Sequence, residues 1–136
     1  MRMSEKAALQ VAVGLACLVP IGAGAAGIVL GAQMIGSSGL PADFDSHFRY
    51  LSGLLLGIGL GFASAIPRIE AQGRRFRLLA AVVVIGGVGR LVSLLMIGAP
   101  SSAMLAALAM ELLVTPGLAV WQRRVAHADR SRDGSG

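Results

Sequence analysis

The chain has 136 residues, of which 55% are hydrophobic and 14% charged, and its formal net charge is +5. A soluble domain usually carries about a quarter charged residues and a disordered chain is poor in apolar ones, so both classes are excluded. The length suits about four membrane spans of roughly 20 residues each. We therefore interpret the excess of basic residues as an indication of how the chain is oriented in a membrane. The expected partner is a lipid bilayer, and no binding of nucleic acid is expected.

The first apolar stretch runs from about residue 7 to residue 32. Arg2 and Lys6 give it the basic start of a signal peptide, but the run is longer than the apolar part of such a signal, about 7–15 residues. We expect an uncleaved span. Cys17 within it is the chain's one cysteine, so it can form neither an internal disulfide nor a CxxC redox pair.

Three further apolar stretches follow, at about 50–66, 76–97 and 102–121. Lipid offers no water to bond backbone groups, so each stretch is predicted to be a helix. Residues 36–41 form a loop by composition, after which Asp43, Asp45 or Ser46 is expected to cap the second helix.

The turn at residues 98–101 is very short and makes the third and fourth helices antiparallel neighbours. The prediction is an all-α, four-helix transmembrane bundle. A four-span membrane domain covers residues 1–121, and a polar cytoplasmic tail covers 122–136, which we expect to be disordered.

Basic residues gather on one side of this topology. Ten of the 12 precede the first span, separate the second from the third, or follow the fourth. The positive-inside rule then predicts that both termini face the cytoplasm, in a multi-pass protein of the inner membrane.

Arg90 and Glu111 lie inside the third and fourth stretches. Counted from the short turn, each is roughly 12–14 Å deep at 1.5 Å per residue, so antiparallel helices bring them to the same level. An isolated charge in lipid costs several kcal/mol, which predicts a buried ion pair. Ser93 and Thr115 lie one turn further along the same faces and extend them as polar stripes. The pair is either a structural clamp or a ligand or proton site.

A second polar cluster precedes and opens the second stretch and comprises Asp43, Asp45, His47, Arg49 and Tyr50. Its spacing is common and no further His or Cys lies on that side, so helix capping and interfacial anchoring are favoured over a metal, and no metal or other cofactor is predicted. Arg49 has an alternative: it could reach toward Arg90 and Glu111 and complete an outward-facing pocket for an anionic or polar ligand.

Glycines recur at helical spacing in the first two stretches. Small residues every fourth position let membrane helices approach closely, whereas a phosphate-binding loop would lie between a strand and a helix. We therefore expect packing stripes. They comprise Gly24, Gly27, Gly31, Gly53, Gly57 and Gly61.

Several short segments resemble a bacterial family of small four-helix membrane proteins, domain of unknown function 4345. They are Phe48-Arg49-Tyr50-Leu51-Ser52-Gly53-Leu54-Leu55-Leu56-Gly57, Ile66-Pro67-Arg68-Ile69-Glu70, Gly89-Arg90-Leu91-Val92-Ser93 and Met110-Glu111-Leu112-Leu113-Val114-Thr115-Pro116. The resemblance extends from the first span to Trp121. It implies a four-helix integral membrane protein and supplies no activity.

Three functions remain open. The first is a non-enzymatic membrane protein that binds a lipid-like or small polar ligand, or that supports a complex with a partner membrane protein. The second is a small transporter or proton-coupled carrier acting as a homodimer, favoured by the titratable Glu111. The third, a quinone-linked redox subunit, lacks paired cysteines or an inward histidine pair. No catalytic residue is predicted, and an enzyme is the less favoured class.

Overall fold

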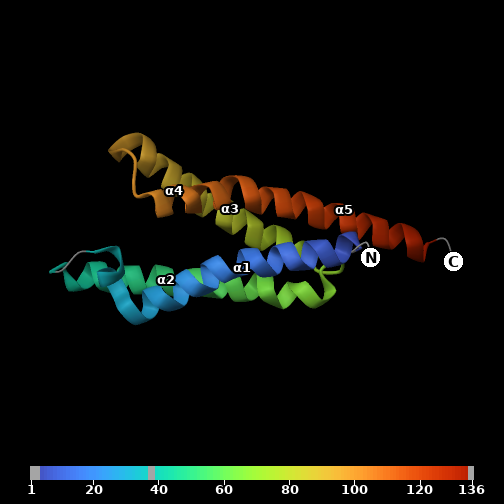
Figure 1. The fold of residues 1–136 in the computed structure, drawn as a ribbon, viewed down its shortest axis with the longest axis horizontal. Helices are drawn as coiled ribbons and strands as arrows, with labels where there is room; N and C mark the ends of the chain where they lie inside the picture. The colour runs from blue at the N-terminus through green and yellow to red at the C-terminus, as the bar shows by residue number, and fades with distance from the viewer. Residues whose placement is uncertain (1–3, 37–38, 135–136) are drawn as a thin grey trace. The chain divides into compact units, whose positions relative to one another are not determined.

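Helices account for the regular structure in the computed structural model, which describes residues 4–36 and 39–134 (Figure 1). The all-α prediction is confirmed. The chain divides into two compact units. The α1–α2 unit comprises Val11–Ile66, and the α3–α5 unit comprises residues 1–10 and 67–136.

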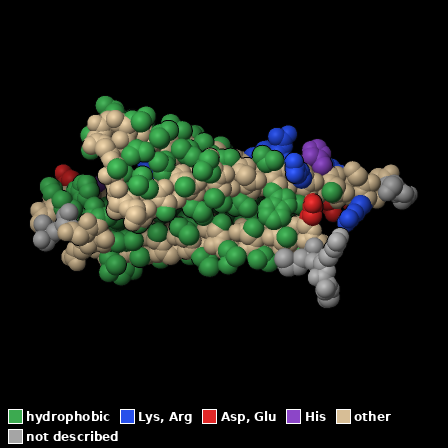
Figure 2. All heavy atoms as spheres, turned by 45° about the horizontal axis from the view of Figure 1, so that its top comes forward, with side chains coloured by type: hydrophobic (Ala, Val, Ile, Leu, Met, Phe, Trp, Pro, Cys, Tyr) green, Lys and Arg blue, Asp and Glu red, His purple; other side chains and the backbone are tan. Residues whose placement is uncertain are grey.

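Four helical segments are long and apolar enough to cross a membrane, as predicted. They are Glu5–Ile35, Ala42–Arg68, Gly73–Ile97 and Ser102–Asp133. In the fourth segment none of the apolar window is buried inside the protein. Figure 2 shows apolar side chains along the helices and basic ones gathered near the end of α5. Such helices need a nonpolar environment around them, which a bilayer supplies.

The α1–α2 unit is a pair of helices joined by a short connection. α1 (Glu5–Leu30) continues into a 3-10 turn, η1 (Gly31–Ile35), and ends at Gly36 with a left-handed φ of 81°. Glycine adopts this conformation without steric cost. Residues 37 and 38 of the predicted loop lie outside the described residues.

α2 spans Ala42–Ala65 and is followed by the 3-10 turn η2, Ile66–Arg68. It begins just before the residues expected to cap it, and well before the apolar stretch that starts near Tyr50. Its N-cap is Pro41, with no side-chain capping bond, so the expected caps Asp43, Asp45 and Ser46 were wrong. Proline restricts φ to a value suited to helix entry, and the three polar residues lie inside the helix.

Glycines let α1 and α2 approach closely. A Cβ added to Gly24 would lie 2.6 Å from the backbone N of Leu56, and one on Gly59 would lie 2.7 Å from Ile21 Cγ1. A Cβ on Gly57 would meet nothing within 4 Å. Packing through Gly24 agrees with the predicted stripe on α1. Of the stripe predicted on α2, Gly53 faces α1, since an added Cβ would lie 3.9 Å from Ile28 Cδ1, whereas Gly57 does not, and the closest approach on this helix is at Gly59, which was not predicted.

The α3–α5 unit contains a long helix and an interrupted one. α3 spans Gly73–Ile97, and the second helix comprises α4 (Ser102–Ala109), a π-helical turn η3 (Met110–Val114) and α5 (Thr115–Asp133). Ser101 caps α4 by accepting a bond from the Met104 N–H at 3.4 Å. The short connection turns the chain back along α3, as predicted (Figure 1).

The polar tail is helical rather than disordered, because α5 continues to Asp133. Its residues Gln122, Val125 and Ala126 are buried, and Ile69 and Phe76 of the same unit are buried as well. Burial of this apolar face explains why the helix persists beyond the apolar stretch. Residues 135 and 136 of the predicted tail lie outside the described part of the chain.

Candidate functional site

Arg90 on α3 and Glu111 in the π turn form a two-point ion pair. Arg90 Nε donates to Glu111 Oε2 at 3.0 Å, and Arg90 Nη2 donates to Oε1 at 3.1 Å. Arg90 Nη1 also lies 3.0 Å from the sulfur of Met104 on α4. A planar guanidinium facing both carboxylate oxygens is the strongest geometry for such a pair.

The pair is only partly buried, in contrast to the predicted buried pair. The Arg90 side chain is 33% exposed and that of Glu111 is 17% exposed. Both residues lie within segments able to cross a membrane. The helices are thus close enough to pair the charges but too few in this unit to enclose them.

The backbone at Glu111 is irregular. The backbone N–H and the hydroxyl of Thr115 both reach the carbonyl of Met110, the hydroxyl at 3.0 Å, and Pro116 follows without an N–H to donate. The bond from the Thr115 N–H to the Met110 carbonyl spans five residues instead of four, which defines a π turn, and Glu111 lies within it. The Thr115 hydroxyl is therefore engaged by the backbone of its own helix, while Ser93 is exposed.

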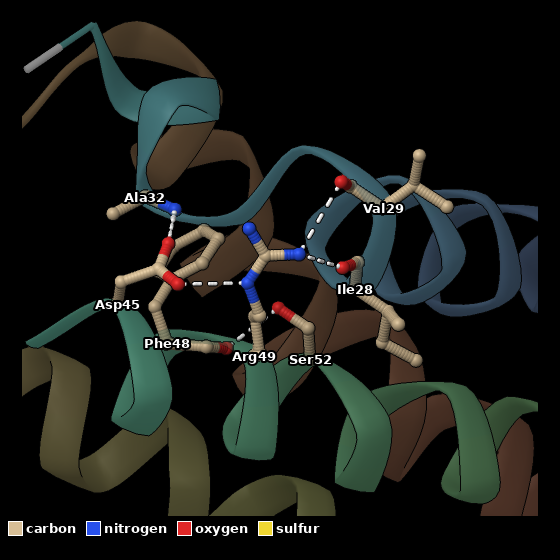
Figure 3. A network of polar contacts seen from close by, with 7 residues as sticks. All are labelled: Ile28, Val29, Ala32, Asp45, Phe48, Arg49 and Ser52. Atoms are coloured by element: carbon tan, nitrogen blue, oxygen red, sulfur yellow. Dashed lines mark hydrogen bonds and ion pairs between the residues drawn. The ribbon is translucent and has the colours of Figure 1, made fainter. Parts of the chain in front are cut away.

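A second polar network joins the end of α1 to the start of α2 (Figure 3). Asp45 accepts the Ala32 N–H at 2.8 Å and Arg49 Nε at 2.8 Å. Arg49 Nη1 donates to the carbonyls of Ile28 and Val29. An arginine at these carbonyls satisfies groups that α1 leaves unpaired at its C-terminus and complements the helix dipole.

The remaining members of the predicted outer cluster are exposed. Asp43, His47 and Tyr50 all lie on the surface of α2, and the His47 and Tyr50 rings are 6.5 Å apart between centroids. Within residues 4–36 and 39–134, no group of three His, Cys, Asp or Glu side chains is placed to hold a metal ion.

The pocket predicted from Arg49, Arg90 and Glu111 draws on both units and stays a prediction. Within the α1–α2 unit, the Arg49 guanidinium already bonds Asp45 and two carbonyls of α1.

An ion pair between Lys6 and Glu70 was not predicted. Lys6 Nζ lies 3.0 Å from Glu70 Oε2, and the Glu70 side chain is 16% exposed. Burial by itself raises the pKa of this carboxyl, but hydrogen bonds from its own backbone N–H and from Lys6 outweigh burial and hold the pKa below its ordinary value of 4.5. The only signal in the sequence was an acidic residue among arginines between two spans.

Residues 8–122 match a family model described as "Domain of unknown function (DUF4345)". No curated protein and no solved structure matches the chain.

Proposed function

The chain belongs to the DUF4345 family, and we propose that it is a multi-pass inner-membrane protein of the ligand-binding or accessory kind. Both termini face the cytoplasm in this proposal, in line with the basic residues before α1, around the α2–α3 link and along α5. The Arg90–Glu111 pair is its recognition site.

The observation that carries the proposal is the partial exposure of this pair. Arg90 is one-third exposed in the middle part of an apolar helix, although its charge is paired with Glu111. Lipid hydrocarbon offers no hydrogen bond to the exposed part of the Arg90 side chain, so a polar group of a ligand, a second copy or a partner membrane protein has to cover it.

The test compares the full chain with a double variant, Arg90→Met with Glu111→Leu, in nanodiscs formed from native membrane. Replacing both charges avoids leaving one of them unpaired, so the variant is expected to fold. Intact-mass measurement should find a bound small molecule or a second chain on the natural protein and neither on the variant. Val92→Leu, at an exposed apolar position of α3, is the matched control. If all three proteins were found as monomers without a bound molecule and with equal thermal stability, a role of the Arg90–Glu111 pair in recognition would be refuted.

The π turn favours a second candidate, a proton-coupled carrier. Such turns recur at functional sites, and this one holds a titratable carboxylate directly before Thr115 and Pro116. Liposomes containing a pH-sensitive dye would report proton movement when small organic anions and cations are supplied outside. A response to one solute that is lost in a folded Glu111→Gln variant would support a carrier. No response to any solute in the natural protein would leave the binding function as the better account.

A further inference from the structure

An open cleft of about 710 Å³ lies within the α3–α5 unit, where the first turn of α3 faces α5. It is distinct from the Arg90–Glu111 pair. The residues that matter for its chemistry are Gly73, Arg74, Arg77, Gln122, Arg123 and Arg130. Trp121, the one tryptophan of the chain, directly precedes Gln122. The cleft therefore begins where the apolar part of the fourth span ends, at the depth expected for headgroups.

The cleft is strongly basic. Its lining includes four arginines against two carboxylates, Glu70 and Asp129. Glu70 is already paired with Lys6. Among the described residues, Arg74, Arg77 and Arg123 have no ion-pair partner. Guanidinium groups gathered without counter-charges repel one another, and an anion bound between them removes that cost.

The N-terminus of α3 lies at the same place. Its N-cap Gln72 makes no side-chain capping bond, and the first turn contains no acidic residue. The positive end of the helix dipole favours an anion here. Side chains that line the cleft also lie close to Gly73: a Cβ on Gly73 would be 3.3 Å from Arg77 Nη1 and 3.4 Å from Gln122 Nε2. Glycine keeps this end of the cleft open.

Gln122 supplies an independent indication of a ligand. Its side chain is fully buried, and its Nε2 donates to the Ile69 carbonyl at 2.8 Å. Its Oε1 is buried with no hydrogen-bond partner among the described residues. Both amide atoms of Gln122 lie close to Gly73, since an added Cβ there would be 3.6 Å from Oε1 and 3.4 Å from Nε2. A buried acceptor without a donor costs about 1–3 kcal/mol, so a hydroxyl group brought by a ligand would be favoured there.

We propose that this cleft binds a phosphate group that carries a hydroxyl donor. The arginines and the α3 N-terminus hold the anionic oxygens, and Gln122 Oε1 accepts the hydroxyl hydrogen. Two sources share this chemistry: the glycerol-phosphate headgroup of a phospholipid, and a free, singly protonated phosphate.

Trp121 fluorescence gives a direct readout on the purified full chain in a neutral detergent. The probes are dihexanoyl phosphatidylglycerol, dihexanoyl phosphatidylmethanol (which has the same charge but no headgroup hydroxyl) and inorganic phosphate. We expect saturable binding of phosphatidylglycerol and a lower affinity for phosphatidylmethanol. Saturation by inorganic phosphate alone would identify the free anion as the source, whereas saturation only by phosphatidylglycerol would identify the lipid.

The variants test the location. Arg74→Gln with Arg123→Gln should weaken binding about tenfold or more, because each charge-assisted bond contributes more than 1 kcal/mol. Arg124→Gln, an exposed arginine on the same helix that does not line the cleft, is the matched control and should retain nearly full affinity. All of these arginines are exposed, so folding should be preserved, as circular dichroism will check. Equal weakening by the control, equal affinity for the two lipids, or no saturation with any probe would overturn the proposal.

Discussion

Gly87 of α3 lies directly against Leu112 of the π turn, so that a Cβ on Gly87 would be 2.8 Å from Leu112 Cδ2 and 2.9 Å from Glu111 Cβ. Gly87 is one helical turn before Arg90 and shares its face. The absence of a side chain at this position lets the π turn approach α3 closely enough for the ion pair to close at 3.0 Å.

Gly87→Ala should therefore destabilise the α3–α5 unit. The added methyl group meets the Glu111 and Leu112 side chains, and overpacking of this kind costs about 1–3 kcal/mol. Thermal unfolding in detergent, followed by circular dichroism, measures the loss. Gly86→Ala and Gly89→Ala are matched controls, because a Cβ at either position meets nothing within 4 Å. Equal destabilisation by all three variants would mean that helix flexibility, rather than this contact, is responsible.

Gly24→Ala should be more harmful than Gly87→Ala. Its new Cβ would meet backbone atoms, 2.6 Å from Leu56 N and 2.7 Å from Ser52 O, which cannot rotate away as a side chain does. The measurement is the unfolding midpoint, with Gly22→Ala as control because its surroundings are open. If Gly24→Ala left the midpoint unchanged, α1 and α2 would not pack through this glycine.

Asp45→Ala should lower the free energy of unfolding by about 1–3 kcal/mol, because the Ala32 N–H and Arg49 Nε both lose their acceptor. Asp45→Asn keeps an acceptor for one of them and should lose less. Asp43→Ala removes an exposed carboxylate two residues earlier, and we expect a change of no more than about 0.5 kcal/mol. Chemical unfolding of the natural chain and the three variants ranks them by their free energy of unfolding. Equal losses at both positions would point to net charge instead of these bonds.

Glu70 should make stability depend on pH. Its pKa in the folded chain is below 4.5, so ionised Glu70 contributes stability above that value, and the contribution is lost as the pH falls through the folded pKa. The difference in unfolding free energy between the natural chain and Glu70→Gln should therefore shrink on acidification below about pH 4.5. Lys6→Met should reduce the same difference at neutral pH. A pH-independent difference would exclude this carboxylate as the titrating group.

The sequence predicted the elements that depend on apolar length and missed those that depend on polar contacts. Hydropathy found four spans, but the apolar stretch within α2 begins only near Tyr50, whereas the helix extends back to Ala42. Asp45 and Arg49 lie in this polar first part and bond the end of α1. Such a contact joins residues distant in the chain and leaves no periodic signal.

The candidate site shows the same division. Equal distances from a short turn were sufficient to pair Arg90 with Glu111. The partial exposure of the two side chains depends on how many helices surround them. The distances of these residues from the turn along the sequence do not indicate that number. In the π turn the N–H and the hydroxyl of Thr115 both donate to the Met110 carbonyl, an arrangement that the apolar pattern does not indicate. Gln122 looked like the first residue of a solvated tail, although it is fully buried.

α5 runs without interruption from the π turn to Asp133 over 19 residues, which makes it a helix roughly 28 Å long at 1.5 Å per residue. A tilt of about 10° at the π turn would move its far end by roughly 5 Å. Arg123 and Arg130 belong to α5, whereas Arg74 and Arg77 belong to α3. The separation between these two pairs of arginines therefore depends on the angle between α3 and α5.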